Sequence, residues 1–327
     1  MPIQKQRDSL RCLGSLLALG AALVLGGCGD GQDNSSSAMP STASASIKQT
    51  TTVLPQQPVV AVTPVPKNAT KSTKRGIADN LGGYSMLDLA AVSPGVSWWY
   101  NWNLTPTSNL PSDYQAMYGM EFVPMIKTGD FVDADVINWL LAHPSVKFLL
   151  VLNEPNRTTQ ANMTPWQAVA VWPRFENIAA KTGVKLVGPA MTNGNTLHYG
   201  DPVYWLDSFY EDFRALYQRD PKIDFLAFHW YDYGLAAALD RMDKYGKQIW
   251  VTEFDNFHTG NDGLQIDSLS KALAQQAQMT NILETRSDVY RYAWYTSRLS
   301  GNPLFINLLS GPGQLTAMGS QYVTLPW

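Results

Sequence analysis

Phe148-Leu149-Leu150-Val151-Leu152-Asn153-Glu154-Pro155-Asn156 joins an unbroken apolar run directly to a carboxylate. A strand made of consecutive Leu and Val residues is buried on both faces, as the strands of a parallel sheet are. A second apolar run, Ile249-Trp250-Val251-Thr252, ends in the same way at Glu253. Because the carboxyl ends of parallel barrel strands form one active face, both acids are predicted to point into the same site.

The rest of the chain between Lys74 and Trp327 supports a closed barrel. Its length suits one such domain, and helical stretches separate its apolar segments. The predicted strands are Arg75–Ala78, Val96–Tyr100, Glu121–Ile126, Lys147–Leu152, Val184–Val187, Ile223–Phe228, Gln248–Val251 and Val289–Trp294. Eight strand and helix units in alternation predict an α/β fold, a single (β/α)8 TIM barrel over residues 74–327.

Helix boundaries between these strands have their own signals. Thr164-Pro165 and Asp201-Pro202 each place a capping residue before a proline at the first helical position. Gly183 and Gly246 stand where helices are expected to end. Pro173 predicts a kink or an interruption in the helix that starts after Thr164.

The first 73 residues are predicted to lie outside the barrel. Residues 1–27 combine a basic start with a short apolar run and resemble a bacterial lipoprotein signal peptide that ends before Cys28. Residues 28–73 are rich in Ser, Thr, Ala and Pro and predict a disordered tether behind a lipidated Cys28. The protein is therefore expected in the bacterial cell envelope, held by a lipid anchor alone, at the outer membrane or the cell surface. A plain signal peptide with a chance cysteine is the alternative.

Cysteine and histidine usage excludes several kinds of site. Cys12 would leave with the signal peptide and Cys28 would carry lipid, so no thiol remains for a disulfide, a nucleophile or a zinc site. The histidines show no metal-ligand spacing. We expect no metal and no other cofactor.

Charge and aromatic content point to an uncharged polymer as the partner. The formal net charge is -3 and the basic residues are scattered, which argues against nucleic acid binding. All 11 Trp and 15 Tyr residues follow the predicted tether. Flat aromatic side chains can stack on the apolar faces of sugar rings, although most aromatics serve the core. A neutral polysaccharide is the expected substrate, and a monomer is the expected state.

Two strand-end acids suggest a glycosidase, with a salt bridge to a neighbouring cation as the alternative for either one. The order of the motifs makes the suggestion specific, since together they resemble glycoside hydrolase family 128. The blocks that carry the resemblance are Val96–Trp102, Glu121–Met125, Asn153–Asn156, Phe228–Tyr231, Trp250–Phe254 and Gly313–Gly319.

The resemblance implies hydrolysis of β-1,3-glucan with retention of anomeric configuration, and endo action is expected. It implies that Glu154 is the acid/base and that Glu253 is the nucleophile. The two carboxyl groups should then lie about 5–5.5 Å apart. Glu154 should have a raised pKa, so that it holds its proton near neutral pH.

Several neighbours of these acids are predicted to contact the substrate. Asn153 is expected to bind a sugar hydroxyl, with capping of the next turn as the alternative. His229 is expected to bind substrate or Glu253, with a core role as the alternative, and Trp230 and Tyr231 follow it in the same block.

Aromatic residues on other strands complete the expected site. Alternation places Trp98, Tyr100 and Trp102 on one face of their strand. We expect Tyr100, Asn101 and Trp102 to touch sugar and Trp98 to lie in the core. Trp294 resembles an aromatic floor of the cleft, with core packing as the alternative.

Lys127 departs from the family pattern, because a Trp-Gly pair is expected at that place. The exchange could shift the subsite preference or admit a modified or anionic glucan. Three further functions stay open: a glycosidase for another β-glycan, an inactive surface lipoprotein that binds glycans, and a structural scaffold.

Overall fold

The computed structural model describes residues 71–300 and 305–327. The predicted signal peptide, Cys28 and nearly all of the tether lie outside the described residues. Lys71, assigned above to the tether, already contacts the barrel, since its Nζ donates to the carbonyls of Ser93, Val96 and Tyr118 at 2.9–3.1 Å. In the described part of the chain, no helix has the length and apolarity to cross a membrane.

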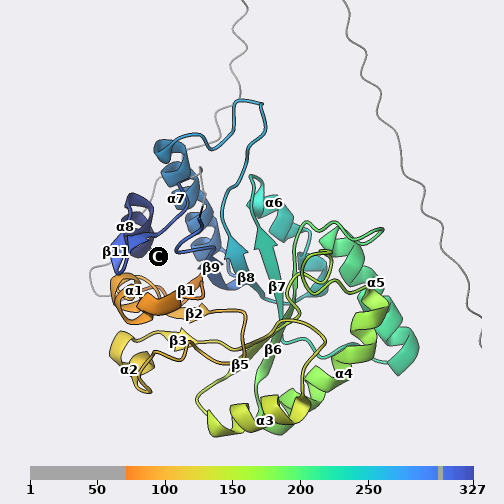
Figure 1. Cartoon of the computed structure of the whole chain (residues 1–327). Helices are drawn as coiled ribbons and strands as arrows, with labels where there is room; N and C mark the ends of the chain where they lie inside the picture. The colour runs from red at the N-terminus through yellow and green to blue at the C-terminus, as the bar shows by residue number, and fades with distance from the viewer. Residues whose placement is uncertain (1–70, 301–304) are drawn as a thin grey trace, which may run out of the picture. The chain divides into compact units, whose positions relative to one another are not determined.

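Parallel strands form the centre of the fold (Figure 1). They are β1 (Arg75–Ala78), β2 (Trp98–Tyr100), β3 (Glu121–Phe122), β4 (Met125–Ile126), β5 (Phe148–Val151), β6 (Lys185–Met191), β7 (Phe225–Trp230), β8 (Ile249–Phe254) and β9 (Val289–Trp294). Their order is β3-β2-β1-β9-β8-β7-β6-β5-β4, and every neighbouring pair is parallel.

The predicted strand Glu121–Ile126 is wrong as a single strand, and the difference explains how the sheet closes. β3 pairs with β2, whereas β4 pairs with β5 at the other end of the strand order. Pro124 between them has no N–H to donate, but its carbonyl accepts from Leu150 N at 2.9 Å. One short segment thus joins both edges of the sheet, which gives the predicted (β/α)8-like arrangement.

Helices lie outside this curled sheet in Figure 1. They are α1 (Ser85–Val92), α2 (Tyr114–Tyr118), α3 (Asp133–Ala142), α4 (Pro165–Thr182), α5 (Pro202–Tyr217), α6 (Leu235–Asp240), α7 (Leu269–Thr285) and α8 (Ala317–Thr324), with 3-10 turns at Gly82–Tyr84 and Asp243–Tyr245. A small antiparallel pair, β10 (Leu309–Gly311) and β11 (Gln314–Leu315), precedes α8.

The predicted helix signals are confirmed, with one exception. Thr164 forms a capping box with Gln167, and the Asp201 side chain accepts from the backbone at the start of α5. Gly183 ends α4 in the left-handed conformation. Of the kink or interruption predicted at Pro173, the interruption is wrong, since α4 runs through this residue. Proline removes one backbone hydrogen bond, whereas burial of the surrounding helix face holds the helix together.

Alternation along the strands separates two apolar cores. Residues that face the barrel axis form one cluster, made of Ala78, Trp98, Tyr100, Val123, Met125, Leu150, Val187, Ala190, Ala227, Trp250 and Ala293. Their sequence neighbours, such as Ile77, Trp99 and Leu149, belong to the larger core beneath the helices. The predicted core position of Trp98 is confirmed, as it is fully buried and packs on Trp250.

Gly76 on β1 gives Trp98 its space inside the barrel. A Cβ at this position would lie 2.3 Å from Trp98 Cε2, which the packed interior cannot absorb. Gly76→Ala should therefore lower the free energy of unfolding by about 1–3 kcal/mol, measured by chemical denaturation. Gly83→Ala is the matched control because nothing lies within 4 Å of its Cβ. Equal stability of the two variants would contradict this packing.

Candidate functional site

Glu154 is held at the carboxyl end of β5 by backbone hydrogen bonds to both neighbouring strand segments. Asn153 N donates to the Lys127 carbonyl at 2.8 Å, and Glu154 N donates to the Ala190 carbonyl at 2.8 Å. Leu152 and Glu154 have φ values of 54° and 47°, in the left-handed region that side chains seldom adopt. Such strain persists where the surroundings fix the backbone, and it is common at functional sites.

Glu253 lies near the end of β8 and accepts hydrogen bonds on both oxygens. Tyr100 Oη and Trp102 Nε1 donate to Oε1 at 2.9 and 2.8 Å, and Tyr231 Oη donates to Oε2. These donors come from β2, from the loop after it, and from the loop after β7. The carboxylate is 4 % exposed, so the three donors fix its orientation and offset the loss of water around its charge.

The two tyrosines remain hydrogen-bond donors at neutral pH. Burial, followed by the negative charge of Glu253, raises the pKa of Tyr100 well above its usual range. The same two causes raise the pKa of Tyr231. Both hydroxyls therefore keep their protons and point them at Glu253.

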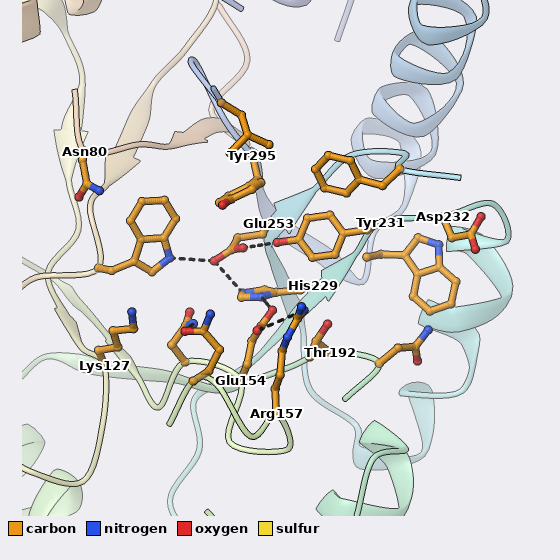
Figure 2. A pocket seen from close by; sticks show the side chains of 17 residues that line it. Asn80, Lys127, Glu154, Arg157, Thr192, His229, Tyr231, Asp232, Glu253 and Tyr295 are labelled. Carbon is orange, nitrogen blue, oxygen red and sulfur yellow. Dashed lines mark hydrogen bonds and ion pairs between the residues drawn. The ribbon is translucent and has the colours of Figure 1, made fainter. Parts of the chain in front are cut away.

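His229 lies between the two acids (Figure 2). Its Nδ1 is 2.9 Å from Glu154 Oε1, and its Nε2 is 2.9 Å from Thr252 Oγ1 and 3.6 Å from Glu253 Oε1. Burial alone would lower the pKa of His229, but the charges of Glu253 and Glu154 and the hydrogen bond to Glu154 raise it above its usual value. The histidine thus bridges the acids electrostatically, with a direct hydrogen bond to Glu154.

The expectation of a raised pKa for Glu154 is wrong for the site without substrate. Burial raises the pKa of this carboxyl group, but the hydrogen bond and charge of His229 lower it, and together with the charges of Arg157 and Lys127 they outweigh burial. Arg157 Nη1 lies 3.8 Å from Glu154 Oε2. Arg157 follows Glu154 by three residues in the chain, whereas the fold brings His229 and Lys127 beside it from other segments.

Glu154, His229 and Glu253 offer ligand atoms within 4.8 Å of one another, which is close enough for one metal ion. However, both ring nitrogens of His229 already have partners, and Glu253 accepts three hydrogen bonds. Carboxylates that bind a catalytic metal need free lone pairs facing a common point. Hydrogen bonding within the cluster accounts for its geometry.

The acids open into a cavity of about 680 Å³, drawn in Figure 2. It is lined by Asn80, Trp102, Lys127, Asn153, Glu154, Arg157, Gln160, Thr192, Asn193, His229, Trp230, Tyr231, Asp232, Glu253, Phe257, Tyr295 and Leu299. A second hollow of about 690 Å³ lies over the loops after β1 and β2 and shares Asn80 with the first. Its other lining residues, from Gly82 to Asn109, include no charged side chain.

Most residues predicted for the site line the first cavity, with three exceptions. Tyr100 is buried behind Glu253, and Asn101 lines the second hollow while its side chain bonds to Asn103 and Thr105. Trp294 does not line the cavity. It packs against Phe254 in the core beneath the helices, so the alternative of core packing is confirmed for Trp294.

Asn153 has an unused acceptor beside the acids. Its Nδ2 donates to Gln160 Oε1 at 3.3 Å, whereas its buried Oδ1 has no hydrogen-bond partner in the described structure. An orphaned buried acceptor in a cavity wall is suited to a hydroxyl of a bound ligand.

Sequence reasoning missed several cavity residues, above all Tyr295 and Arg157. Tyr295 directly follows β9 and packs edge-on to Trp102 and Tyr231, with ring centroids at 5.9 and 5.8 Å. Strand alternation places the neighbours Trp294 and Tyr295 on opposite sides of the sheet. Trp294 therefore lies in the core, whereas Tyr295, one residue later, lines the cavity. Arg157, three residues after Glu154, was a detectable signal, because this spacing brings two side chains together in a tight turn.

Residues 76–322 match the glycosyl hydrolase catalytic core family. Among curated proteins, alkali-sensitive linkage protein 1 of Schizosaccharomyces pombe is 26 % identical over 268 residues. The match covers 77 % of this chain and 45 % of that protein, so the chain spans less than half the length of this relative.

Solved structures give the same assignment. A family 128 (subgroup II) endo-β-1,3-glucanase from Pseudomonas viridiflava is 54 % identical with a TM-score of 0.77, and the match covers 79 % of this chain and all of that one. A subgroup I endo-β-1,3-glucanase from Amycolatopsis mediterranei, solved with laminaritriose, is 26 % identical with a TM-score of 0.60. That match covers 78 % of this chain and 100 % of the other.

Arg157 provides a test of the electrostatics at Glu154. Removing its positive charge takes away one cause of the lowered pKa, so Arg157→Gln should move the titration of the Glu154 carboxyl group to higher pH. The measurement is a ¹³C NMR titration of the side-chain carboxyl carbons. Arg241→Gln is the matched control, since Arg241 pairs with Asp201 at the start of α5. An unchanged or lower midpoint for Glu154 would contradict the role given to Arg157.

Proposed function

Since the chain belongs to glycoside hydrolase family 128 and is a glycoside hydrolase, we propose that it hydrolyses β-1,3-glucan with retention of anomeric configuration. The observation that supports this most is the close pairing of the two acids. One oxygen of Glu154 and one of Glu253 lie within 4.8 Å, well below the roughly 6.5–9.5 Å that leaves room for a water between two carboxyl groups. Direct attack by one carboxylate fits this spacing.

In the first step, Glu253 attacks the anomeric carbon and Glu154 gives its proton to the departing glycosidic oxygen. The bond between sugar and leaving group breaks as the ester bond to Glu253 forms. Tyr100, Trp102 and Tyr231 hold Glu253 for this attack. Asn153 Oδ1 is free to accept a hydrogen bond from a sugar hydroxyl beside the cleaved bond.

The proton for this step belongs to Glu154 and His229 together. Their 2.9 Å contact lets one proton lie on either Nδ1 or Oε1, and such a pair titrates as a unit. When substrate displaces water from the site, the charged form of Glu154 loses solvation. This favours the neutral carboxyl group. The lowered pKa of Glu154 in the open site is therefore compatible with its role as the acid once substrate is bound.

In the second step, Glu154 takes a proton from water, whose oxygen attacks the anomeric carbon and releases Glu253. The ester removes the negative charge of Glu253, and the positive charge of Arg157 then favours the ionised, basic form of Glu154. The two steps thus use opposite protonation states of one residue.

Endo action is the mode that the adjoining hollows support. The cavity around the acids and the second hollow share Asn80, and together they offer about 680 and 690 Å³ of space. A chain that continues past the cleaved bond needs such a path on both sides. Uncharged Asn, Thr and Ser side chains in the second hollow suit the hydroxyls of a glucan.

Replacement of each acid should give a distinct kinetic signature on linear β-1,3-glucan oligosaccharides. Glu253→Gln should lose roughly 10⁴-fold or more in kcat, because no nucleophile remains. Glu154→Gln should lose a similar factor on glucan, but much less on an aryl glycoside whose leaving group needs no proton. NMR of fresh wild-type products should show the β anomer first.

Two controls make this test decisive. Circular dichroism and thermal unfolding of both variants show whether the fold is retained. Azide, as an external nucleophile, should rescue Glu154→Gln with an activated substrate and yield the β-glycosyl azide. Equal losses of both variants on the activated substrate, or an α-anomeric first product, would reject the proposed mechanism.

A further inference from the structure

Arg157 stands apart from the other arginines of the barrel. In residues 71–300 and 305–327, every other arginine donates at least one hydrogen bond to a carboxylate or carbonyl. Arg157 donates none, and its one ion pair, to Glu154, is long at 3.8 Å. Its side chain is 44 % exposed and lines the cavity. None of its five N–H donors therefore makes a hydrogen bond to the residues that the structure describes.

Lys127 is a second cation of the same kind. Its side chain is exposed, lines the cavity, and has no hydrogen bond or ion pair to any residue that the structure describes. Figure 2 shows Lys127 and Arg157 on either side of Glu154, with Glu253 above all three in this view. The two cations thus lie on either side of Glu154 in the lining of the cavity.

The nearby acids make no short hydrogen bond to these cations, and the one ion pair, between Arg157 and Glu154, is long at 3.8 Å. Glu253 is occupied by three donors from other elements, and Asp232 forms an ion pair with His258 at 2.9 Å. Glu154 makes its short contact with His229. Two positive charges in the cleft therefore remain available to a ligand.

Their presence also works against the reaction step that Glu154 performs first. Both cations favour the ionised form of Glu154, whereas protonation of the leaving group needs the neutral form. A ligand anion beside these cations would offset their charge at the moment when the acid is required.

We propose that Lys127 and Arg157 bind a carboxylate substituent on the glucan, so that the preferred substrate is an acidic, substituted β-1,3-glucan. This inference rests on the proposed β-1,3-glucanase function and names the substrate class of the same site. Guanidinium and ammonium groups form short, charge-assisted hydrogen bonds with carboxylates, and the Arg fork can bind both oxygens.

The test compares two polymers of equal chain length, linear β-1,3-glucan and its partly carboxymethylated form. The kcat/KM of the wild-type protein and of Lys127→Gln/Arg157→Gln is measured on both. The loss caused by the double substitution should be about tenfold larger on the acidic polymer, which is the worth of one strong charge-assisted contact. About 0.5 M NaCl should shrink this difference, because salt screens exposed charges. Comparing the variants on each polymer cancels any steric effect of the carboxymethyl groups.

Lys147→Gln/Lys181→Gln is the matched control, since it removes the same net charge at exposed positions before β5 and at the end of α4. It should show no difference between the polymers. Equal losses on both polymers for Lys127→Gln/Arg157→Gln would overturn the inference while leaving the glucanase function intact. Failure of the wild type to cleave the neutral polymer would instead count against the proposed function. In that case, the affinity of the Glu253→Gln variant for each polymer still shows whether Lys127 and Arg157 favour the carboxymethylated form.

Discussion

One fully buried histidine within reach of two buried carboxyl groups is the constraint on which this active site depends. Acids so close together repel each other, and burial penalises each charge. His229 offsets the cost of burying charge on Glu154 through a 2.9 Å contact. For Glu253, this cost is offset by hydrogen bonds from Tyr100, Trp102 and Tyr231. These partners come from different strands, so the site exists only when the barrel has closed.

Closure of the barrel depends in turn on short, exact contacts between strands. The β3 and β4 segments join the two edges of the sheet, and the Lys127 carbonyl just after β4 accepts from Asn153. Packing inside the barrel, where Gly76 makes room for Trp98, keeps the strands in register. The strained backbone at Glu154 is tolerated because these contacts hold it from both sides.

The features that sequence predicted well are local. Apolar runs and capping residues located the strands and helices, and strand ends located Glu154 and Glu253, because buried parallel strands have a simple pattern. Pro124 was the visible sign that one predicted strand would split. Trp294 and Tyr295 show what the sequence pattern could not decide. Trp294 was predicted to line the cleft, but the next residue, Tyr295, does so, because adjacent residues at the end of β9 point to opposite sides.

Electrostatics was the part that sequence could not supply. The pKa of Glu154 depends on burial and on His229, and then on Arg157 and Lys127, and the fold determines how close these side chains lie to it. The resemblance to family 128 implies the roles that we propose for the two acids, whereas the charge beside them follows from the fold. Lys127 and Arg157 affect the pKa of Glu154, and they are also the residues that we propose bind an acidic substrate.

The formation of a covalent sugar ester on Glu253 tests the mechanism most directly. The protein is incubated with a 2-deoxy-2-fluoro β-1,3-linked disaccharyl fluoride, which forms the ester quickly and hydrolyses it slowly, and is then digested for mass spectrometry. Double displacement predicts one disaccharide label, located on the peptide that contains Glu253. A label on another residue, or turnover without any label and with an α-anomeric product, would contradict it.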